Sequence, residues 1–420
     1  MQYYHRMRWA ALALFLLAFI STGHAQGSPY DVIGFGLPIR SGNAVTEALG
    51  GTGVALDGNR VVNDLNPADW TWITRARFGA SLRYDYDNAT LGGVNDLQQN
   101  VQFSGASFAA PVWSRLNATI ALGYVPLTNA SNNINITDSL GTRNYVIRGG
   151  TNLVFAGVAA RPVPAIALGA RLDLVTGDIR HIGQLTPTDS TAGVGQFERD
   201  YLFYGVRPTF GIEIIGDSIS NALSGITIGA SYSFATNLNS TNEQIITPVA
   251  STLDTTLESS GVGRYPAALS AGISFHLSRR YRVEADYFLQ DFSSAYLYSP
   301  QAISGDSMLR SSNRISFGIE RVPNLNNEYG SATGFDKWAL RLGFSYGALP
   351  INPVGSGGIN ELSISGGVGI PISFESLLNL SVVAGRRQPV NAGTAPNETF
   401  LRLGADVSFS ENWFTPTRRQ

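Results

Sequence analysis

From Arg77 onward, the chain alternates apolar residues with small or polar residues in one stretch after another. The first stretch interleaves Phe78, Ala80, Leu82, Tyr84 and Tyr86 with Gly79, Ser81, Arg83 and Asp85. Successive side chains of a β-strand point to opposite faces of the sheet. The period of two therefore predicts strands whose two faces differ in polarity.

Fourteen such strands are predicted, an even number, as expected for a single-chain outer-membrane barrel. They lie near residues 77–87, 101–112, 116–126, 145–160, 165–178, 200–214, 224–236, 265–277, 280–292, 313–322, 337–347, 360–371, 377–386 and 399–410. We therefore interpret residues 77–414 as an all-β, 14-stranded antiparallel transmembrane β-barrel.

The connections between these strands alternate in length. Those at 113–115, 161–164 and 277–280 are short, and those at 127–144, 179–199, 237–264 and 293–312 are longer and polar. Short turns lie on the periplasmic side of such barrels, so both ends of the mature chain are predicted there. The connections at 216–225 and 322–336 fit this scheme less well, and a helical turn is expected in the first.

A soluble β-sandwich is the alternative interpretation of the same pattern. Its second face would be rich in Lys, Glu and Thr, whereas here that face carries Gly, Ser, Ala and isolated charges such as Arg171 and Glu284. Only 14% of all residues are charged, against about 25% in soluble domains. Isolated charges among small residues are typical of a confined lumen, which favours the barrel.

The N-terminus has the pattern of a secretory signal peptide, predicted at residues 1–25. Arg6 and Arg8 precede an apolar run from Trp9 to Ile20, which is too short for the roughly 20 residues of a membrane-spanning helix. Its removal leaves 27 basic and 31 acidic residues, a net charge near −4 that does not indicate nucleic acid as a partner. The chain has no cysteine, which excludes disulfides, thiolate metal sites and a lipidated N-terminus.

Residues 26–76 do not alternate, and they are too few for an independent domain. They contain Gly50, Gly51 and Gly53 and then Asn66-Pro67-Ala68. Glycines allow close backbone packing, and Asn-Pro favours a turn. We expect this segment to fold into the lumen as a plug, or hatch.

The stretch Ala48–Ala55, followed by Asn66-Pro67-Ala68, resembles the hatch of the outer-membrane long-chain fatty acid and hydrophobic compound transporter family. In that family a glycine-rich stretch precedes an "NPA" motif just ahead of the first of fourteen strands. The resemblance implies hatch-gated, passive uptake of small hydrophobic molecules, either long-chain fatty acids or hydrocarbons. The chain differs from the family pattern in having Asp69 after this motif.

The C-terminus also differs from the family pattern, because residues 415–420 form a basic tail after Phe414. A terminal strand with an aromatic end is what the barrel-insertion machinery reads. The Bacteroidetes-type branch of the resembled family has comparable ends, and some of its members serve a protein-secretion machine. Docking of exported proteins or of a secretion complex is therefore the alternative function.

The sequence offers no catalytic group, metal site or cofactor site. An enzyme needs a nucleophile, a base and an orienting group, but the mature chain has only two histidines. His276 is predicted to face the lumen, and His181 lies in a predicted loop. Asp85 and Asp87 share one strand face, too few oxygen ligands for a metal, and Asp85 is expected to pair with Arg83 or Arg77.

Candidate ligand-binding residues are those that break the polar pattern of the predicted lumen face or carry a cation there. The apolar candidates are Phe288, Val125, Val158 and Val383, and the candidates for an anionic head group are Arg341, Arg402 and Arg207. Contact with the hatch explains the first set equally well, and cross-strand ion pairs explain the second.

The expected location is the bacterial outer membrane, and the expected contacts are the lipid bilayer, lipopolysaccharide, the barrel-insertion machinery and a small hydrophobic ligand. A general polar porin is a third, weaker option. The sequence does not specify the ligand or the oligomeric state.

Overall fold

The computed structural model describes residues 27–40, 42–58, 61–139, 141–188, 194–247, 255–299, 308–322, 334–373, 376–411 and 413. The predicted signal peptide, Phe414 and the basic tail lie outside these residues. No helix among the described residues is long and apolar enough to cross a membrane.

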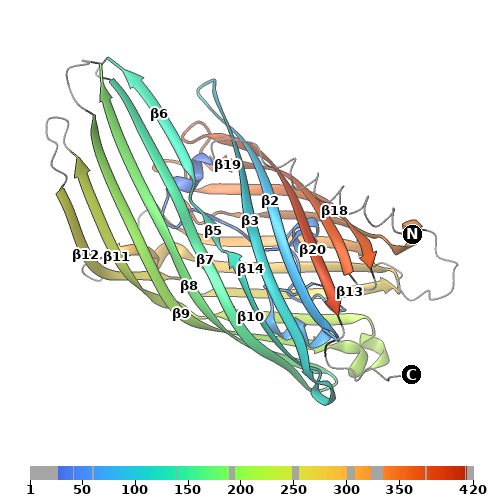
Figure 1. The fold of residues 1–420 in the computed structure, drawn as a ribbon. Coiled ribbons are helices and arrows are strands. Elements are labelled where there is room, and N and C mark those ends of the chain that lie inside the picture. Colours follow the sequence, from blue (N-terminus) through green and yellow to red (C-terminus); the bar gives the residue numbers. More distant parts are fainter. Residues whose placement is uncertain are drawn as a thin grey trace, which may run out of the picture.

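The described strands form one closed antiparallel barrel with fourteen wall positions, which confirms the predicted fold class (Figure 1). Ten positions are single strands: β2 (Ala76–Leu91), β3 (Val94–Trp113), β7 (Gly141–Val163), β8 (Ile166–Pro187), β9 (Gly195–Ile215), β16 (Ser311–Arg321), β17 (Ala339–Ala348), β18 (Ile359–Ser373), β19 (Ser376–Pro389) and β20 (Asn397–Glu411).

The other four positions are strands interrupted by a bend. They combine β4 (Ala118–Pro126) with β6 (Asn132–Asp138), β10 (Ile226–Ser233) with β11 (Thr236–Thr247), β12 (Thr255–Tyr265) with β13 (Ala268–Ser278), and β14 (Tyr281–Asp291) with β15 (Tyr296–Ser299). In each combination both pieces pair with the same neighbouring wall position. The barrel closes where β2 pairs with β20.

Short 3₁₀ turns connect several of these strands. They are η3 (Ser114–Leu116), η4 (Gly216–Ser218), η5 (Asn221–Leu223), η6 (Phe292–Ser294) and η7 (Gly334–Lys337). The helical turn expected within 216–225 is therefore confirmed by η4 and η5.

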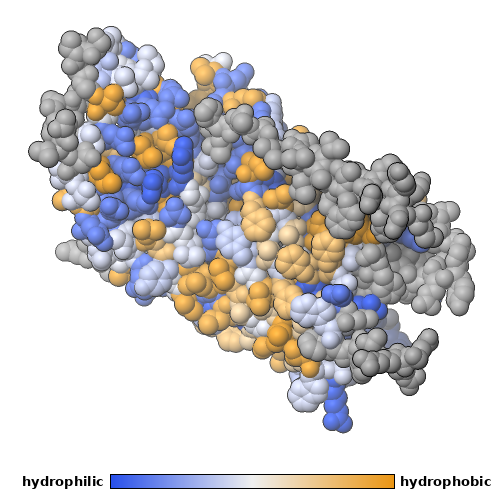
Figure 2. Space-filling model, viewed as in Figure 1, coloured by the Kyte–Doolittle hydropathy of each residue, from blue (hydrophilic) through white to orange (hydrophobic). Residues whose placement is uncertain are grey.

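The two faces of the wall differ as the alternation predicts. On β2, Phe78 is 48% exposed and points outward, whereas Ser81, Arg83 and Asp85 are buried on the lumen side. Arg83 Nε lies 2.8 Å from Asp85, which confirms the expected pairing. Apolar side chains cover the lower part of the outer face in Figure 2, as expected for a wall in contact with lipid.

Several predicted long loops are mostly strand, which corrects the sequence interpretation. The ranges 127–144, 179–199 and 237–264 contain β6, the long ends of β7, β8 and β9, and β11 with most of β12. His181 accordingly lies within β8 and not in a loop. These strand ends extend beyond the apolar zone of the wall. Figure 2 shows polar side chains on the extensions. Both faces of the extension meet water, so hydropathy gives little strand signal there.

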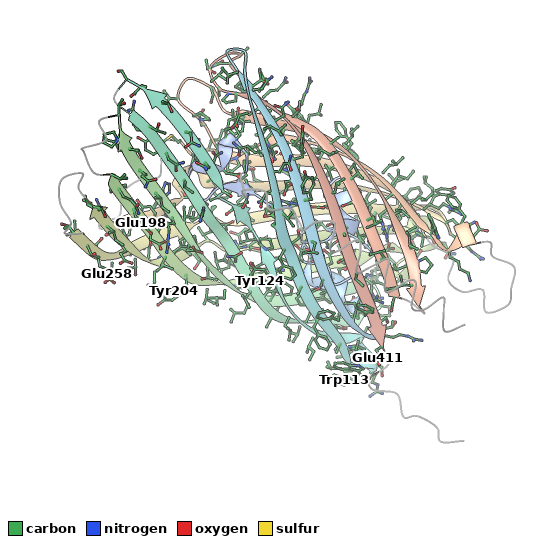
Figure 3. All side chains as sticks on the ribbon, turned by 45° about the horizontal axis from the view of Figure 1, so that its top comes forward. Trp113, Tyr124, Glu198, Tyr204, Glu258 and Glu411 are labelled. Atoms are coloured by element: carbon green, nitrogen blue, oxygen red, sulfur yellow. The ribbon has the colours of Figure 1, made fainter. Side chains whose placement is uncertain are left out.

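The two ends of the barrel are named here by their connections. At the turn end, β2 begins at Ala76 and β20 ends at Glu411, and Trp113 lies at the same end (Figure 3). At the loop end lie the long strand extensions, which carry Glu198 and Glu258. Gly27 donates to Ser131 O and so lies toward the loop end. The periplasmic location of both ends of the mature chain stays a prediction.

Two neighbouring wall positions are not paired with each other along part of their length. Toward the loop end, β3 pairs with β2 only, since its pairing with β4 ends at Ala106 opposite Tyr124. The strand β6 pairs with β7 only. Within the described residues, the β3 and β6 edges are thus not joined to each other.

Candidate functional site

The described residues between Gly27 and Thr74, called here the inner segment, lie inside the barrel. They include η1 (Pro29–Val32), β1 (Leu37–Pro38), α2 (Ala44–Ala48) and η2 (Pro67–Trp72). The helix α2 contacts β17, β18, β19 and β20, whereas η2 contacts β4, β7, β8 and β9. The segment therefore crosses the lumen from one side of the wall to the other.

The rear portion of the inner segment, residues Asn43 to Ile73, packs directly on glycines of the wall. A Cβ atom on Gly343 would lie 2.1 Å from Gly50 N, and one on Gly229 would lie 2.1 Å from Val54 O. The same close approach occurs at Gly169, Gly211, Gly318, Gly367 and Gly404. We call these seven residues the glycine row. Any side chain there would push the rear portion off the wall.

The Asn66-Pro67-Ala68 motif anchors this packing. Asn66 Oδ1 caps η2 by accepting the N–H of Ala68 at 3.0 Å, and Asn66 Nδ2 donates to Val54 O at 2.7 Å. Pro67 occupies the first turn of η2, where its missing N–H costs nothing. Trp70 follows, fully buried, with its ring stacked on Phe155 at a centroid distance of 5.9 Å.

The glycines of the hatch motif allow the turn that follows α2. Gly50 and Gly51 have φ angles of 74° and 86°, which an L side chain rarely adopts. The N–H of Gly50 donates to Ser365 Oγ at 3.0 Å, so the turn is tied to β18. The hatch-motif residues thus have structural roles in holding the rear portion.

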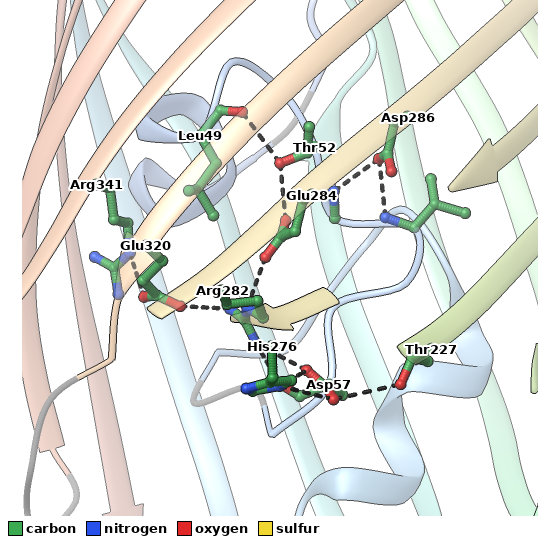
Figure 4. Close-up of polar contacts among 12 residues, drawn as sticks. Leu49, Thr52, Asp57, Thr227, His276, Arg282, Glu284, Asp286, Glu320 and Arg341 are labelled. Atoms are coloured by element: carbon green, nitrogen blue, oxygen red, sulfur yellow. Dashed lines mark hydrogen bonds and ion pairs between the residues drawn. The ribbon is translucent and has the colours of Figure 1, made fainter. Parts of the chain in front are cut away.

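Two wall carboxylates bind the backbone and side chains after this turn (Figure 4). Asp286 Oδ2 accepts the N–H groups of Gly53 at 2.8 Å and Val54 at 3.0 Å. Glu284 Oε2 accepts the hydroxyl of Thr52 at 2.8 Å. Backbone donors that would be orphaned in the lumen are satisfied in this way.

Asp57 makes a further tie near the turn end (Figure 4). Its carboxylate lies 2.9 Å from His276 Nε2 and 3.2 Å from Arg282 Nη1. Burial raises the pKa of Asp57, but the hydrogen bonds from His276 and Arg282 outweigh it and lower that pKa below its usual value. His276 faces the lumen, as predicted.

Arg282 joins the Asp57 tie to a network of ion pairs on the wall (Figure 4). Its Nε lies 2.7 Å from Glu284, and it also pairs with Glu320. Arg341 pairs with the same Glu320 at 2.8 Å. Each buried charge thus has an opposite charge beside it, as burial requires.

The front portion of the inner segment, residues Gly27 to Ile39, is held differently. Its strand β1 pairs with β5 (Thr128–Asn129), and the N–H of Ile39 donates to Leu127 O at 2.7 Å. Phe35 packs edge-on against Tyr265 and Phe203, with ring centroids 5.3 and 5.8 Å apart. The front portion therefore lies beside the unpaired edges of β3 and β6.

Asp31 is the one described acidic residue of the front portion, and it is 3% exposed. Burial raises its pKa well above the usual range, and the neighbouring carboxylates of Asp87 and Glu398 raise it further. Its Oδ2 accepts a hydrogen bond from Asn129 Nδ2 at 3.1 Å. A charge at this position therefore costs the front portion stability.

A cavity of about 110 Å³ lies between the inner segment and the wall. Its apolar lining includes Ile39 and Leu65 of the inner segment and Val125, Leu153 and Phe288 of the wall. Four guanidinium groups also line it, those of Arg40, Arg171, Arg207 and Arg314. The cavity thus combines an apolar lining with an excess of positive charge.

Two of these guanidiniums retain unused donors. Arg40, which joins the front and rear portions, stacks on the Phe288 ring at 4.2 Å, and its Nε has no hydrogen-bond partner among the described residues. Burial lowers the pKa of Arg40 to about 10, so it remains a cation at neutral pH. Arg207 contacts Asp173 at 3.4 Å, but its Nη1 has no partner within the same residues.

The other two arginines of the cavity are each paired with a carboxylate. Arg171 pairs with Asp173 at 2.6 Å and donates to Asp64 O, and Arg314 pairs with Glu361 at 2.8 Å. Donors for an incoming anion therefore come from Arg40 and Arg207.

The structure separates the predicted ligand-binding residues into three groups. Phe288, Val125 and Arg207 line the cavity. Val383, Arg341 and Arg402 face the lumen elsewhere, and the two arginines are already paired, Arg341 with Glu320 and Arg402 with Asp85 at 3.2 Å. Val158 is 55% exposed on the outer face, so its predicted inward orientation is wrong.

The error at Val158 has a physical cause. Both faces of β7 are apolar at this level, because inward Leu153 and Phe155 belong to the buried core that includes Trp70, while Val154 and Val158 face outward. Hydropathy therefore cannot assign the faces there. The sequence pattern does not identify Arg40, because this residue lies in the segment without alternation, where no period marks an inward position.

The family model of BamG matches residues 7–419 of this sequence. The chain belongs to the BamG family. No curated protein matches this BamG-family sequence.

Solved structures with the same fold as this BamG-family chain include the toluene transporter TbuX of Ralstonia pickettii, at a TM-score of 0.59 and 15% identity over 91% of this chain and 99% of TbuX. A Pseudomonas aeruginosa FadL homologue matches at a TM-score of 0.60 and 11% identity over 90% of this chain and all of that chain, 100%. The CymD monoaromatic hydrocarbon channel matches at 0.55 and 16%, over 93% and 100%. These likenesses confirm the fold predicted from the alternation.

Proposed function

We propose that this protein is an outer-membrane transporter that takes up amphipathic molecules passively, with the front portion of the inner segment as its gate. The main support for this proposal is the chemistry of the cavity lining. The apolar lining suits an alkyl or aryl body, and the free donors of Arg40 and Arg207 suit a carboxylate. Fatty-acid-like ligands fit this chemistry better than neutral hydrocarbons. The structural neighbours named as toluene and hydrocarbon transporters support the general class.

The size and lining of the cavity support a gating role for the front portion. A volume of about 110 Å³ is well below the roughly 300 Å³ at which ligand pockets begin. Pro38 and Ile39 of the front portion form part of its lining. Displacing them would enlarge the cavity toward the unpaired edges of β3 and β6. We infer a lateral path for the ligand at this side of the wall.

Locking the front portion tests the gate directly. Leu37 and Asn129 are antiparallel partners, a spacing within the range for a disulfide, and the chain has no cysteine of its own. The double variant Leu37→Cys/Asn129→Cys should lose uptake of a labelled long-chain fatty acid when oxidised and regain it after reduction. Equal uptake in both states would exclude gating by the front portion.

The single variants Leu37→Cys and Asn129→Cys serve as the matched controls. Each carries only one thiol, since the chain has no cysteine of its own, and therefore cannot form the lock. Each should transport the fatty acid equally well under oxidising and reducing conditions.

Charge recognition in the cavity is tested with Arg40→Gln. The affinity for a fatty acid should fall about tenfold, which corresponds to roughly 1.4 kcal/mol for a lost charged hydrogen bond. Binding of toluene should not change. The control is Arg386→Gln, since Arg386 is exposed on the outer face of β19. Equal losses for both ligands would assign Arg40 a structural role only.

The second candidate is docking of exported proteins or of an assembly complex. The match to the BamG family model favours this docking function, because it points to a barrel-assembly context. The polar strand extensions at the loop end would supply the surface. Purification of the native protein with a stoichiometric protein partner and no retained lipid-like ligand would support this function over uptake.

A further inference from the structure

The outer face of the wall has an apolar hollow near the turn end, separate from the lumen cavity. It measures about 770 Å³ and crosses β4, β7, β8, β9 and β10. Four alanines form its floor: Ala118, Ala160, Ala170 and Ala230. The hollow therefore lies in the part of the wall that faces lipid.

The register of the strands explains the hollow. Ala170 is the lateral partner of Val158 on one side and of Phe210 on the other. Phe210 is 51% exposed and projects beyond the alanine floor. Ala230 likewise pairs with Ile212. The side chains around the floor thus stand higher than the floor itself.

The inner face of the same wall is also built from small residues. Gly169 and Gly211, which pair with each other, lie against Pro67 and Asn66 of the inner segment. The wall between the hatch motif and the hollow is therefore only a backbone thick. Filling the hollow from outside would support the point at which the rear portion is anchored.

The turn end of the hollow carries an interfacial aromatic residue and a cation. Trp113 and Leu116 line it, and Arg115 lies between them in the turn η3. Trp113 is 56% exposed, and Arg115 is exposed and makes no ion pair with any residue that the structure describes. Tryptophan and arginine together are typical of the depth at which lipid head groups lie.

We propose that this hollow binds one acyl chain of a phospholipid, with the lipid phosphate at Arg115. The apolar lining excludes a polar occupant, and its position on the lipid-facing wall supplies the acyl chain. Arg115 provides the complementary charge for the phosphate. The site is independent of the transported ligand, because it lies on the other side of the wall from the cavity.

Native mass spectrometry of the full protein with added phosphatidylglycerol tests the site. The unmodified protein should retain one lipid, and Ala170→Leu/Ala230→Leu should reduce the retained fraction at least fivefold by filling the floor. The control is Ala285→Leu/Ala405→Leu, since both alanines face outward elsewhere on the wall. Equal retention by both double variants, or retention of none by the unmodified protein, would overturn the proposal.

The head-group contact is tested with a variant that does not alter the wall. The unmodified protein should bind phosphatidylglycerol about tenfold more tightly than diacylglycerol, which lacks the phosphate. Arg115→Gln should bind the two equally. An unchanged preference would exclude the phosphate contact, and a detergent or protein segment that persists in the hollow when lipid is added would exclude the acyl chain.

Discussion

The front and rear portions of the inner segment lie in the same lumen but are held by different interactions. The rear portion packs on the glycine row, and its backbone N–H groups are bound by wall groups such as Asp286 and Ser365. The front portion pairs with the short strand β5 and buries Asp31 at a cost. Under the proposed function, the rear portion is the anchor and the front portion is the gate.

Local stability follows from this difference, because segments that move are drawn from the less stable parts of a fold. The carboxylates of the rear portion lie beside cations. Asp57 pairs with His276 and Arg282, and Glu47, whose pKa is raised by burial, lies 3.6 Å from Arg83. The front portion has a carboxyl whose ionised form is disfavoured. We therefore expect the front portion to exchange its amide hydrogens faster than the rear.

The largest effect is expected from filling the glycine row. In Gly367→Val the new Cβ would lie only 2.5 Å from Ala48 Cβ. The rear portion should therefore detach from the wall, or the barrel should fail to close. Overpacking of this kind costs about 1–3 kcal/mol and can cost more. Loss of the heat-modifiable folded band on a denaturing gel measures it.

The control for this variant is the adjacent residue. Gly366 faces outward, and a Cβ there would meet only ordinary contacts at 3.5 Å or more. Gly366→Val should fold normally. Equal damage from both variants would show that the wall and not the inner segment requires glycine at this level.

A smaller effect is expected at Asp286. Asp286→Ala would leave the N–H groups of Gly53 and Val54 without an acceptor, which costs about 1–3 kcal/mol for a buried donor. Hydrogen exchange should accelerate in the rear portion and remain unchanged in the front portion. Asp286→Asn keeps a carbonyl acceptor and should lie between Ala and the unmodified protein. Faster exchange confined to the front portion would reverse the assignment of anchor and gate.

The smallest effect is expected from pH. The folded pKa of Asp31 is raised, so its contribution to stability is fully present below the unfolded pKa of about 3.9 and is lost as pH rises through the folded value. Proteolysis or exchange of the front portion should therefore slow as pH falls toward 4. Asp31→Asn should remove this dependence, and an unchanged pH profile would exclude Asp31 as its source.

Asp57 responds with the opposite sign. Its folded pKa is lowered, so its stabilisation is present above the unfolded pKa and is lost only as pH falls through the folded value. The tie between Asp57 and His276 should thus persist at pH values that already tighten the front portion. Measuring exchange in both portions across one pH series separates the two effects.

The sequence by itself determined the barrel and most of its strand faces. A membrane allows only helices or closed sheets to span it, and a period of two without a long apolar run leaves the closed sheet. The local structure of the hatch motif was also predictable from the sequence, since Gly50, Asn66 and Pro67 favour particular backbone conformations. Phe288, Val125 and Arg207 were placed in the lumen by alternation alone.

Only the tertiary structure decided which of these residues meet. Asp57 and His276 are 219 residues apart, and Gly50 and Ser365 are 315 apart, so no local pattern links them. Val158 was misplaced because both faces of β7 are apolar where the inner segment packs. Arg40 Nε has no hydrogen-bond partner among the described residues, because Arg40 is buried against the Phe288 ring. Only the folded lumen brings these two side chains together. Periodicity thus defines the wall, whereas side-chain proximity across the lumen defines the site.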